Sequence, residues 1–126
     1  ITCEAVTLWG TGTPMREFLW SEEMADASVH VLLNVDFKDT CMEGSKDIRN
    51  CHINVGTGKE VCIREVAEMI MKEVQFKGDL RWDSSKPDGT MRKLTDVSKL
   101  HSLGWHHKVE IDEGIERLYE WYLKGV

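Results

Sequence analysis

The sequence has no run of apolar residues long enough to cross a bilayer, and it shows no stripe of basic residues. Its 16 lysines and arginines stand against 22 aspartates and glutamates, which gives a net charge of −6. Proteins that bind duplex nucleic acid normally present clustered positive charge. We therefore expect neither nucleic acid nor a membrane among its partners.

Closely spaced cysteines are also missing. The four cysteines, at positions 3, 41, 51 and 62, form no CxxC pair and are too few for a secreted disulfide scaffold. The first residues, Ile1-Thr2-Cys3-Glu4, have neither the basic nor the apolar segment of a signal peptide. We expect reduced thiols and a cytoplasmic location, although a single bridge through Cys41 or Cys51 remains open. Since no initiator Met is present, we expect a piece of a longer protein.

The catalytic motifs of several enzyme classes are absent as well. Val55–Lys59 has two glycines between an expected strand and a helix, but it lacks the length of GxxxxGK[ST] and the third glycine of GxGxxG. We interpret it as a structural turn. The adjacent pairs Cys51-His52 and His106-His107 lack metal-ligand spacing, so we expect no metal site. No GxSxG elbow occurs, and Cys62 is interpreted as a cap or core residue rather than a nucleophile.

What is present indicates a small mixed α+β fold of the α/β class. At 126 residues the chain can bury a core without disulfides. Alternating and turn-bounded apolar residues predict short strands at 6–9, 16–20, 52–55 and 80–82. The first two form either a hairpin-like pair or strands of different sheets. Apolar residues at helical spacing predict helices at 22–35, 63–74, 97–103 and 112–123, and the polar segment 36–51 is expected to be a long, mobile surface loop.

Helix-capping residues support these boundaries. Ser21 is the expected N-cap of the first helix, followed by acidic residues in the first turn. Cys62 and Glu65 have the spacing of a capping box, with a thiol in place of the usual hydroxyl. Asp96 is expected to cap the 97–103 helix, and Gly104 to end it.

Two loop segments carry polar side chains suited to a ligand. Residues 9–16 read WGTGTPMR and residues 86–93 read KPDGTMRK. Arginine beside a turn held by glycine and proline can grip phosphate oxygens in bidentate fashion. Aspartate in a Pro-Asp-Gly turn can accept hydrogen bonds from a ribose diol, and tryptophan can form the wall of a sugar pocket.

These segments resemble the GDP-L-fucose synthase family of the extended short-chain dehydrogenase/reductases. The similarity is carried by VTLWGTGTPMREF at 6–18, HINVGTG at 52–58, SKPDGT at 85–90, LHSLGW at 100–105 and YEWYL at 119–123. It extends over nearly the whole chain except the polar segment 36–51. The first stretch is highly specific, whereas the NVGTG stretch is shared by many sugar-nucleotide enzymes of the superfamily.

The resemblance implies a function for the chain. Enzymes of this family have an N-terminal Rossmann domain that binds NADP and a smaller C-terminal substrate domain. They epimerise two carbons of a GDP-linked keto sugar and then reduce its ketone with NADPH. Residues 1–126 resemble the C-terminal substrate-binding domain, so the resemblance implies no catalytic, cofactor-binding or metal residue in this chain and a homodimer for the full-length enzyme.

Three residues match family positions that contact the GDP-sugar. The resemblance assigns Arg16 to the diphosphate and places Trp9 and Asp88 along the sugar or nucleoside. The sequence departs from the family pattern at Trp20–Glu23, where a Tyr/His-Val-Asp-Asp run is common, and at Met91, where proline is common. Two alternatives remain open: the substrate domain of another nucleotide-sugar epimerase or dehydratase, and a binding module without catalytic activity.

Overall fold

The computed structural model describes residues 4–41 and 48–125. In chain order the elements are β1 (Ala5–Trp9), β2 (Met15–Arg16), α1 (Ser21–Asn34), α2 (Phe37–Thr40), β3 (Val61–Cys62), α3 (Ile63–Glu73), β4 (Asp79–Asp83), α4 (Ser98–Ser102) and α5 (Ile111–Leu123). The fold is a mixture of helices and short strands, which confirms the expected fold class.

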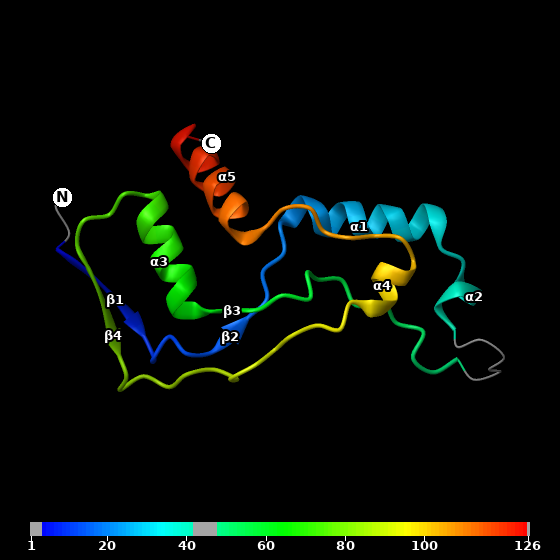
Figure 1. The fold of residues 1–126 in the computed structure, drawn as a ribbon, viewed down its shortest axis with the longest axis horizontal. Helices are drawn as coiled ribbons and strands as arrows, with labels where there is room; N and C mark the ends of the chain where they lie inside the picture. Colours follow the sequence, from blue (N-terminus) through cyan, green and yellow to red (C-terminus); the bar gives the residue numbers. More distant parts are fainter. Residues whose placement is uncertain (1–3, 42–47, 126) are drawn as a thin grey trace.

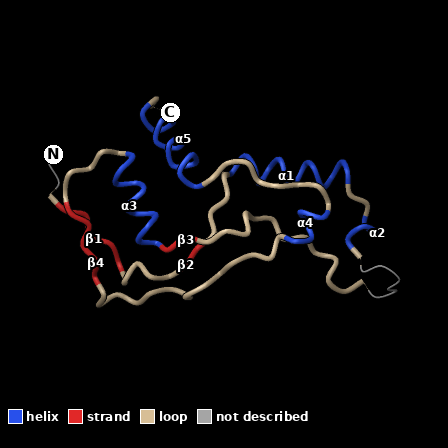
Figure 2. The backbone as a smooth tube through the Cα atoms, viewed as in Figure 1, coloured by secondary structure: helices blue, strands red, loops and turns tan. Residues whose placement is uncertain are grey.

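The strands of the described residues form two separate pairs (Figure 2). β1 and β4 run parallel, with Val6 opposite Leu80 and Leu8 opposite Trp82. β2 and β3 run antiparallel, with Met15 opposite Cys62. β1 and β2 therefore belong to different sheets, and this decides between the two arrangements that the sequence left open.

The helices divide between the two ends of the molecule (Figure 1). α3 and α5 lie side by side at the end that holds β1 and β4, whereas α1, α2 and α4 lie at the other end. The buried core belongs to the second group, where Ala27, Leu100 and Trp105 are almost inaccessible to solvent. The indole Nε1 of Trp105 donates to Asp26 Oδ2 at 2.8 Å, so the one polar atom of this ring is satisfied.

A second buried contact joins α1 to the segment before α5. The side chain of Glu23 is 8% exposed, and its Oε1 accepts hydrogen bonds from the backbone N–H groups of Lys108 and Val109 at 2.5 and 3.2 Å. A buried carboxylate needs such donors because burial without them costs free energy. Glu23 therefore fixes the entry to α5 against the start of α1.

Apolar surface is left exposed around α3 and α5. One groove runs between the β1–β4 pair and α3, and it is lined by Val6, Leu8, Ala67, Ile70, Met71, Val74, Phe76 and Leu80. A second lies between α3 and α5 and includes Leu118, Trp121 and Tyr122, each more than half exposed. A contiguous apolar surface of this kind is typical of a contact with another protein surface.

Several elements match the expectations closely. Cys62 and Glu65 form the capping box of α3: Cys62 Sγ accepts from Glu65 N at 3.4 Å, and Glu65 Oε2 accepts from Cys62 N at 3.0 Å. α5 begins one residue earlier than predicted. α4 matches only in part: its N-cap is Val97 rather than the predicted Asp96, although Asp96 Oδ1 accepts from Ser98 N, and Gly104 follows this helix with φ +89°.

Other expectations were wrong. Residues 52–55 form no strand, because Ile53 and Val55 pack on the core as irregular chain rather than pairing with another strand. The second strand covers only Met15–Arg16, so 17–20 is irregular. The expected loop at 36–51 contains α2, which has its own capping box through Asp36 and Asp39. Residues 42–47 of that loop lie outside the described part of the chain.

The N-terminus of α1 also differs from the prediction. Ser21 is the first helical residue rather than the N-cap, which is Trp20 without a side-chain hydrogen bond. The indole Nε1 of Trp20 instead donates to Glu22 Oε2 at 3.1 Å. Acidic side chains in the first turn still complement the helix dipole.

Candidate functional site

The two loop segments singled out in the sequence lie against each other, although they are more than 70 residues apart. Thr11 is the connection: its backbone N–H donates to Asp88 Oδ1 at 2.8 Å and its hydroxyl donates to Asp88 Oδ2 at 2.6 Å. These two hydrogen bonds lower the pKa of Asp88 below its ordinary value, the side-chain bond contributing most. Asp88 is therefore a carboxylate at neutral pH.

Two glycines permit this close approach. Gly10 and Gly12 have φ of +83° and +76°, a region that other residues adopt only with strain. A Cβ on Gly10 would overlap the Asp88 carboxylate, and one on Gly12 would lie 2.6 Å from the ring of Trp82. Glycine is thus required at positions 10 and 12 by packing on both sides of the turn.

The side chain and backbone of Arg64 hold the Gly10–Gly12 turn in place. Arg64, at the start of α3, donates from Nη2 to Thr11 O at 2.5 Å and from its backbone N–H to Gly12 O at 2.9 Å. Its guanidinium also stacks on Trp82, with Cζ 4.6 Å from the ring centroid. These contacts fix the backbone of the turn in one conformation.

Arg16 lies at the edge of the same surface. Its Nη1 donates to the carbonyl oxygens of Met15 and Thr90, both at 2.6 Å. Across the described residues, its Nε and Nη2 make no hydrogen bond, so part of the guanidinium remains available to a ligand. A Cβ on Gly89 would lie 3.0 Å from Nη2, which shows how closely the guanidinium approaches the backbone of the second loop.

Trp9 completes the surface. Its side chain is 75% exposed, and the ammonium of Lys86 lies 5.6 Å from its ring centroid. An exposed indole at the end of a strand offers a flat apolar face to a ring or a sugar. The structure therefore brings Trp9, Arg16 and Asp88 to one loop cluster, which we call the turn surface and define as residues 9–16 and 86–92.

Two basic residues of the second loop already interact with groups of the protein itself. Lys86 covers Trp9, and Arg92 forms an ion pair with Glu60. The turn surface nevertheless concentrates positive charge on a chain of net charge −6. Such a local excess of cations suits an anionic ligand.

The Val55–Lys59 turn binds an anion of the protein's own. The N–H groups of Thr57 and Gly58 donate to Oε1 of Glu17 at 2.7 and 2.6 Å. A phosphate-binding turn uses such amides, and these two are already occupied by the protein's own carboxylate. The structural interpretation of the turn is confirmed, although no strand precedes it.

Sequence reasoning missed the supporting residues Thr11, Glu17, Arg64 and Trp82. Glu17 follows Arg16 directly in the segment that carries the resemblance, and its place in that segment could have marked it as part of the site. Arg64 and Trp82 had no local signal, because their contacts depend on how α3 and β4 pack around the turn.

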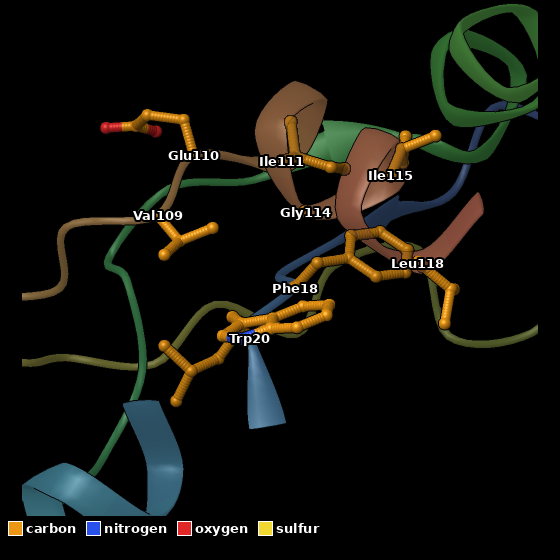
Figure 3. Close-up of a pocket in the computed structure, with 9 residues that line it drawn as sticks. Phe18, Trp20, Val109, Glu110, Ile111, Gly114, Ile115 and Leu118 are labelled. Carbon is orange, nitrogen blue, oxygen red and sulfur yellow. The ribbon is translucent and has the colours of Figure 1, made fainter. Parts of the chain in front are cut away.

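A separate hollow lies beside the start of α5 (Figure 3). It measures about 180 Å³ and is lined mainly by apolar side chains, including Phe18, Trp20, Ile111 and Ile115. Figure 3 shows the Glu110 carboxylate pointing away from these apolar side chains, and this group is engaged by Lys59 and His107. The hollow is smaller than the ~300–1,000 Å³ of ordinary ligand sites and has no converging polar groups, so we treat it as a packing gap.

The four histidines outside helix α1 and all described cysteines provide no metal site. Among residues 4–41 and 48–125, no group of three His, Cys, Asp or Glu side chains converges on a point. Cys41, Cys51 and Cys62 carry free thiols. No helix in this described part is both long and apolar enough to cross a membrane.

Known proteins with similar sequences include enzymes named for GDP-linked sugars. The model of the NAD dependent epimerase/dehydratase family matches residues 2–56. The GDP-L-fucose synthase of Escherichia coli K12 is 47% identical over 120 residues, which cover 95% of this chain and 36% of the relative. The chain thus spans about a third of the length of the curated relatives that it matches.

Solved structures lead to the same group of proteins. A GDP-6-OMe-4-keto-L-xylo-heptose reductase from C. jejuni superposes with a TM-score of 0.89 at 45% identity, covering 98% of this chain and 35% of that one. A GDP-mannoheptose C4 reductase from Campylobacter jejuni, solved with NADP bound, superposes with a TM-score of 0.84 at 44% identity, covering 95% of this chain and 35% of that one. The aligned part is a C-terminal portion of these longer proteins. Over the matched residues the chain is thus similar to the NAD dependent epimerase/dehydratase family and, over nearly its whole length, to GDP-L-fucose synthase.

Proposed function

We propose that this chain is the GDP-sugar-binding domain, residues 1–126, of a longer NADP-dependent enzyme. That enzyme converts GDP-4-keto-6-deoxy-D-mannose to GDP-L-fucose by epimerisation at two carbons and reduction of the ketone. The observation that carries the proposal is the convergence of Trp9, Arg16 and Asp88 on one turn surface. The 47% identity to a GDP-L-fucose synthase over this whole region supports the choice of substrate.

Three residues of the turn surface have proposed roles that suit their chemistry. Arg16 binds the diphosphate, since the unengaged part of its guanidinium presents planar donors to two oxygens. Trp9 covers the sugar or the nucleoside with its exposed indole. Asp88 accepts hydrogen bonds from hydroxyl groups of the ligand, because each of its oxygens keeps a lone pair beyond its bond to Thr11.

The cofactor is NADP, bound by a part of the longer enzyme outside this chain. The reductase of Campylobacter jejuni, similar over this region, was solved with NADP bound. Inside this chain, the amides of Thr57 and Gly58 in the Val55–Lys59 turn already hold the Glu17 carboxylate. NADPH would supply the hydride that reduces the ketone, and this chain contributes the binding and orientation of the sugar nucleotide. The longer enzyme is further proposed to be a homodimer.

A second candidate substrate follows from the structural comparison. The heptose reductase superposes over nearly the whole chain at an identity close to that of the fucose synthase. A GDP-linked 4-keto heptose would use the same diphosphate contact and differ only at the sugar. The two substrates would therefore be distinguished by whichever residues face the sugar and not by Arg16.

The test is turnover by the longer enzyme with both GDP-linked 4-keto sugars and NADPH. We expect NADPH oxidation with GDP-4-keto-6-deoxy-D-mannose and formation of GDP-L-fucose, identified by chromatography and NMR. Isothermal titration of this chain alone with NADPH is the accompanying measurement, and no micromolar binding is expected. Turnover of a UDP-sugar in preference to either GDP-sugar would contradict the proposal.

A further inference from the structure

One carboxylate beside the turn surface holds together two segments that are distant in the sequence. Glu17 Oε1 accepts from Thr57 N at 2.7 Å and Gly58 N at 2.6 Å, and its Oε2 accepts from Thr95 N at 3.1 Å. The hydroxyl of Thr57 adds a longer contact of 3.3 Å. Three backbone donors on one carboxylate make a charge-assisted cluster, which is stronger than bonds between neutral groups.

The surrounding residues are built around this carboxylate. A Cβ on Gly56 would lie 2.5 Å from Glu17 Oε1, so only glycine leaves room for it there. Thr57 is 7% exposed, and its amide would be unsatisfied without Glu17. Burial alone would raise the pKa of Glu17, but the hydrogen bonds from Thr95, Gly58 and Thr57 outweigh it and lower the pKa below its ordinary value.

Glu17 and Arg16 hold opposite ends of the same segment. Arg16 Nη1 donates to Thr90 O, and Met15 N donates to Met91 O at 2.8 Å. At the other end of this segment, Thr95 N donates to Glu17. Residues 90–95 are thus held at one end by Arg16 and at the other by Glu17. The carbonyl of Thr90, which orients Arg16, belongs to this segment.

We propose that Glu17 is a positioning residue for Arg16, acting through residues 90–95 and the 56–58 turn. It does not touch the ligand. Loss of its carboxylate releases Thr95, loosens the segment that carries Thr90 O, and lets the Arg16 guanidinium leave the orientation that suits the diphosphate. This inference rests on the proposed function, in which Arg16 binds that diphosphate.

The test compares Glu17→Gln with Glu23→Gln in the longer enzyme. Gln keeps the shape of Glu but places an NH2 group against one of the backbone donors. Glu23 is the matched control, because it is another carboxylate that accepts two backbone N–H groups, but it lies on α1 outside the turn surface. We expect Glu17→Gln to raise KM for the GDP-sugar about tenfold, the equivalent of one weakened charge-assisted contact, with kcat and KM for NADPH nearly unchanged. Glu23→Gln is expected to leave all three constants near their original values and to lower the melting temperature.

A double-mutant cycle separates positioning from general destabilisation. If Glu17 acts through Arg16, Arg16→Ala with Glu17→Gln should raise KM no further than Arg16→Ala alone. Additive effects, or a parallel fall of kcat and NADPH affinity, would overturn the inference. Glu17→Asp keeps the charge at shorter reach, so it should give an intermediate KM and remains measurable if the Gln variant does not fold.

The outcome for Arg16→Ala alone reports on the proposed function. An unchanged KM in that variant refutes the assignment of Arg16 to the diphosphate, and with it the substrate site. A raised KM in Arg16→Ala together with an unchanged KM in both Glu17 variants refutes only the positioning role.

Discussion

Replacing Arg16 with alanine in the longer enzyme should weaken the GDP-sugar complex without affecting the cofactor. The contacts of Arg16 indicate how large the loss of binding free energy should be. Nη1 is occupied by the carbonyls of Met15 and Thr90, which leaves Nη2 and Nε for the diphosphate. Two charge-assisted hydrogen bonds, less the cost of ordering the ligand, correspond to about 2–4 kcal/mol of kcat/KM.

Most of that loss should be in KM. The diphosphate keeps its charge throughout the reaction at the sugar. If Arg16 binds it as proposed, the contact stabilises the ground state and the transition state almost equally. Steady-state kinetics with the GDP-sugar varied at saturating NADPH measure the effect, and the KM for NADPH serves as the internal reference. A weakened NADPH complex, or a fall in kcat with KM unchanged, would refute the assignment.

Two further variants sharpen this experiment. Arg16→Lys should recover only part of the loss, because a point charge cannot reproduce planar bidentate donors. Arg81→Ala is the matched control: Arg81 is exposed on β4, 3.9 Å from Asp79 Oδ2, in an ion pair worth little. A loss in Arg81→Ala as large as that in Arg16→Ala would show that the effect is general electrostatics rather than a specific contact.

Three other outcomes are expected from the structure. Cys62→Ser should raise the free energy of unfolding by about 0.5–1 kcal/mol, because a hydroxyl is a better acceptor for Glu65 N than a thiol; urea denaturation measures this, and a loss of stability would contradict it. Since the pKa of Glu17 is lowered in the folded state, its stabilising contribution is present above its unfolded pKa of about 4.3 and is lost as pH falls through the folded pKa. Glu17→Gln should therefore flatten the acid side of the stability–pH curve, and an unchanged slope would argue against this. The isolated chain should self-associate through the groove that contains Trp121 and Tyr122, and a strictly monomeric species in sedimentation velocity at all concentrations would count against it.

The helices were more predictable from the sequence than the strands. α3 and α5 have apolar residues on one face and identifiable first-turn residues, and both were located to within a residue or two. The strand predicted at 52–55 failed because its apolar residues pack onto Leu100 and Trp105 without pairing. A short apolar run indicates burial, but it does not specify whether the backbone pairs with another strand.

The candidate site was predictable only in part. The glycine and proline residues identified both loops, and the resemblance supplied the three residues Trp9, Arg16 and Asp88. The contacts that shape the site are long-range. Asp88 reaches Thr11 across 77 positions, and Arg64 reaches it across 53. No local pattern encodes such pairs, because they depend on the parallel pairing of β1 with β4 and on the start of α3.

The Val55–Lys59 turn shows how a local motif changes meaning in its fold. Two consecutive amides beside glycines form an anion-binding concavity, and its sequence alone does not identify the anion. In this chain the anion is covalently part of the protein, 40 residues earlier, on the residue next to Arg16. Here the turn holds Glu17, whose second carboxylate oxygen accepts from Thr95 N at the end of the segment that carries Thr90 O, the carbonyl bound by Arg16. A glycine motif is therefore evidence of an anion, and only the surrounding packing decides whether that anion is a ligand or a side chain.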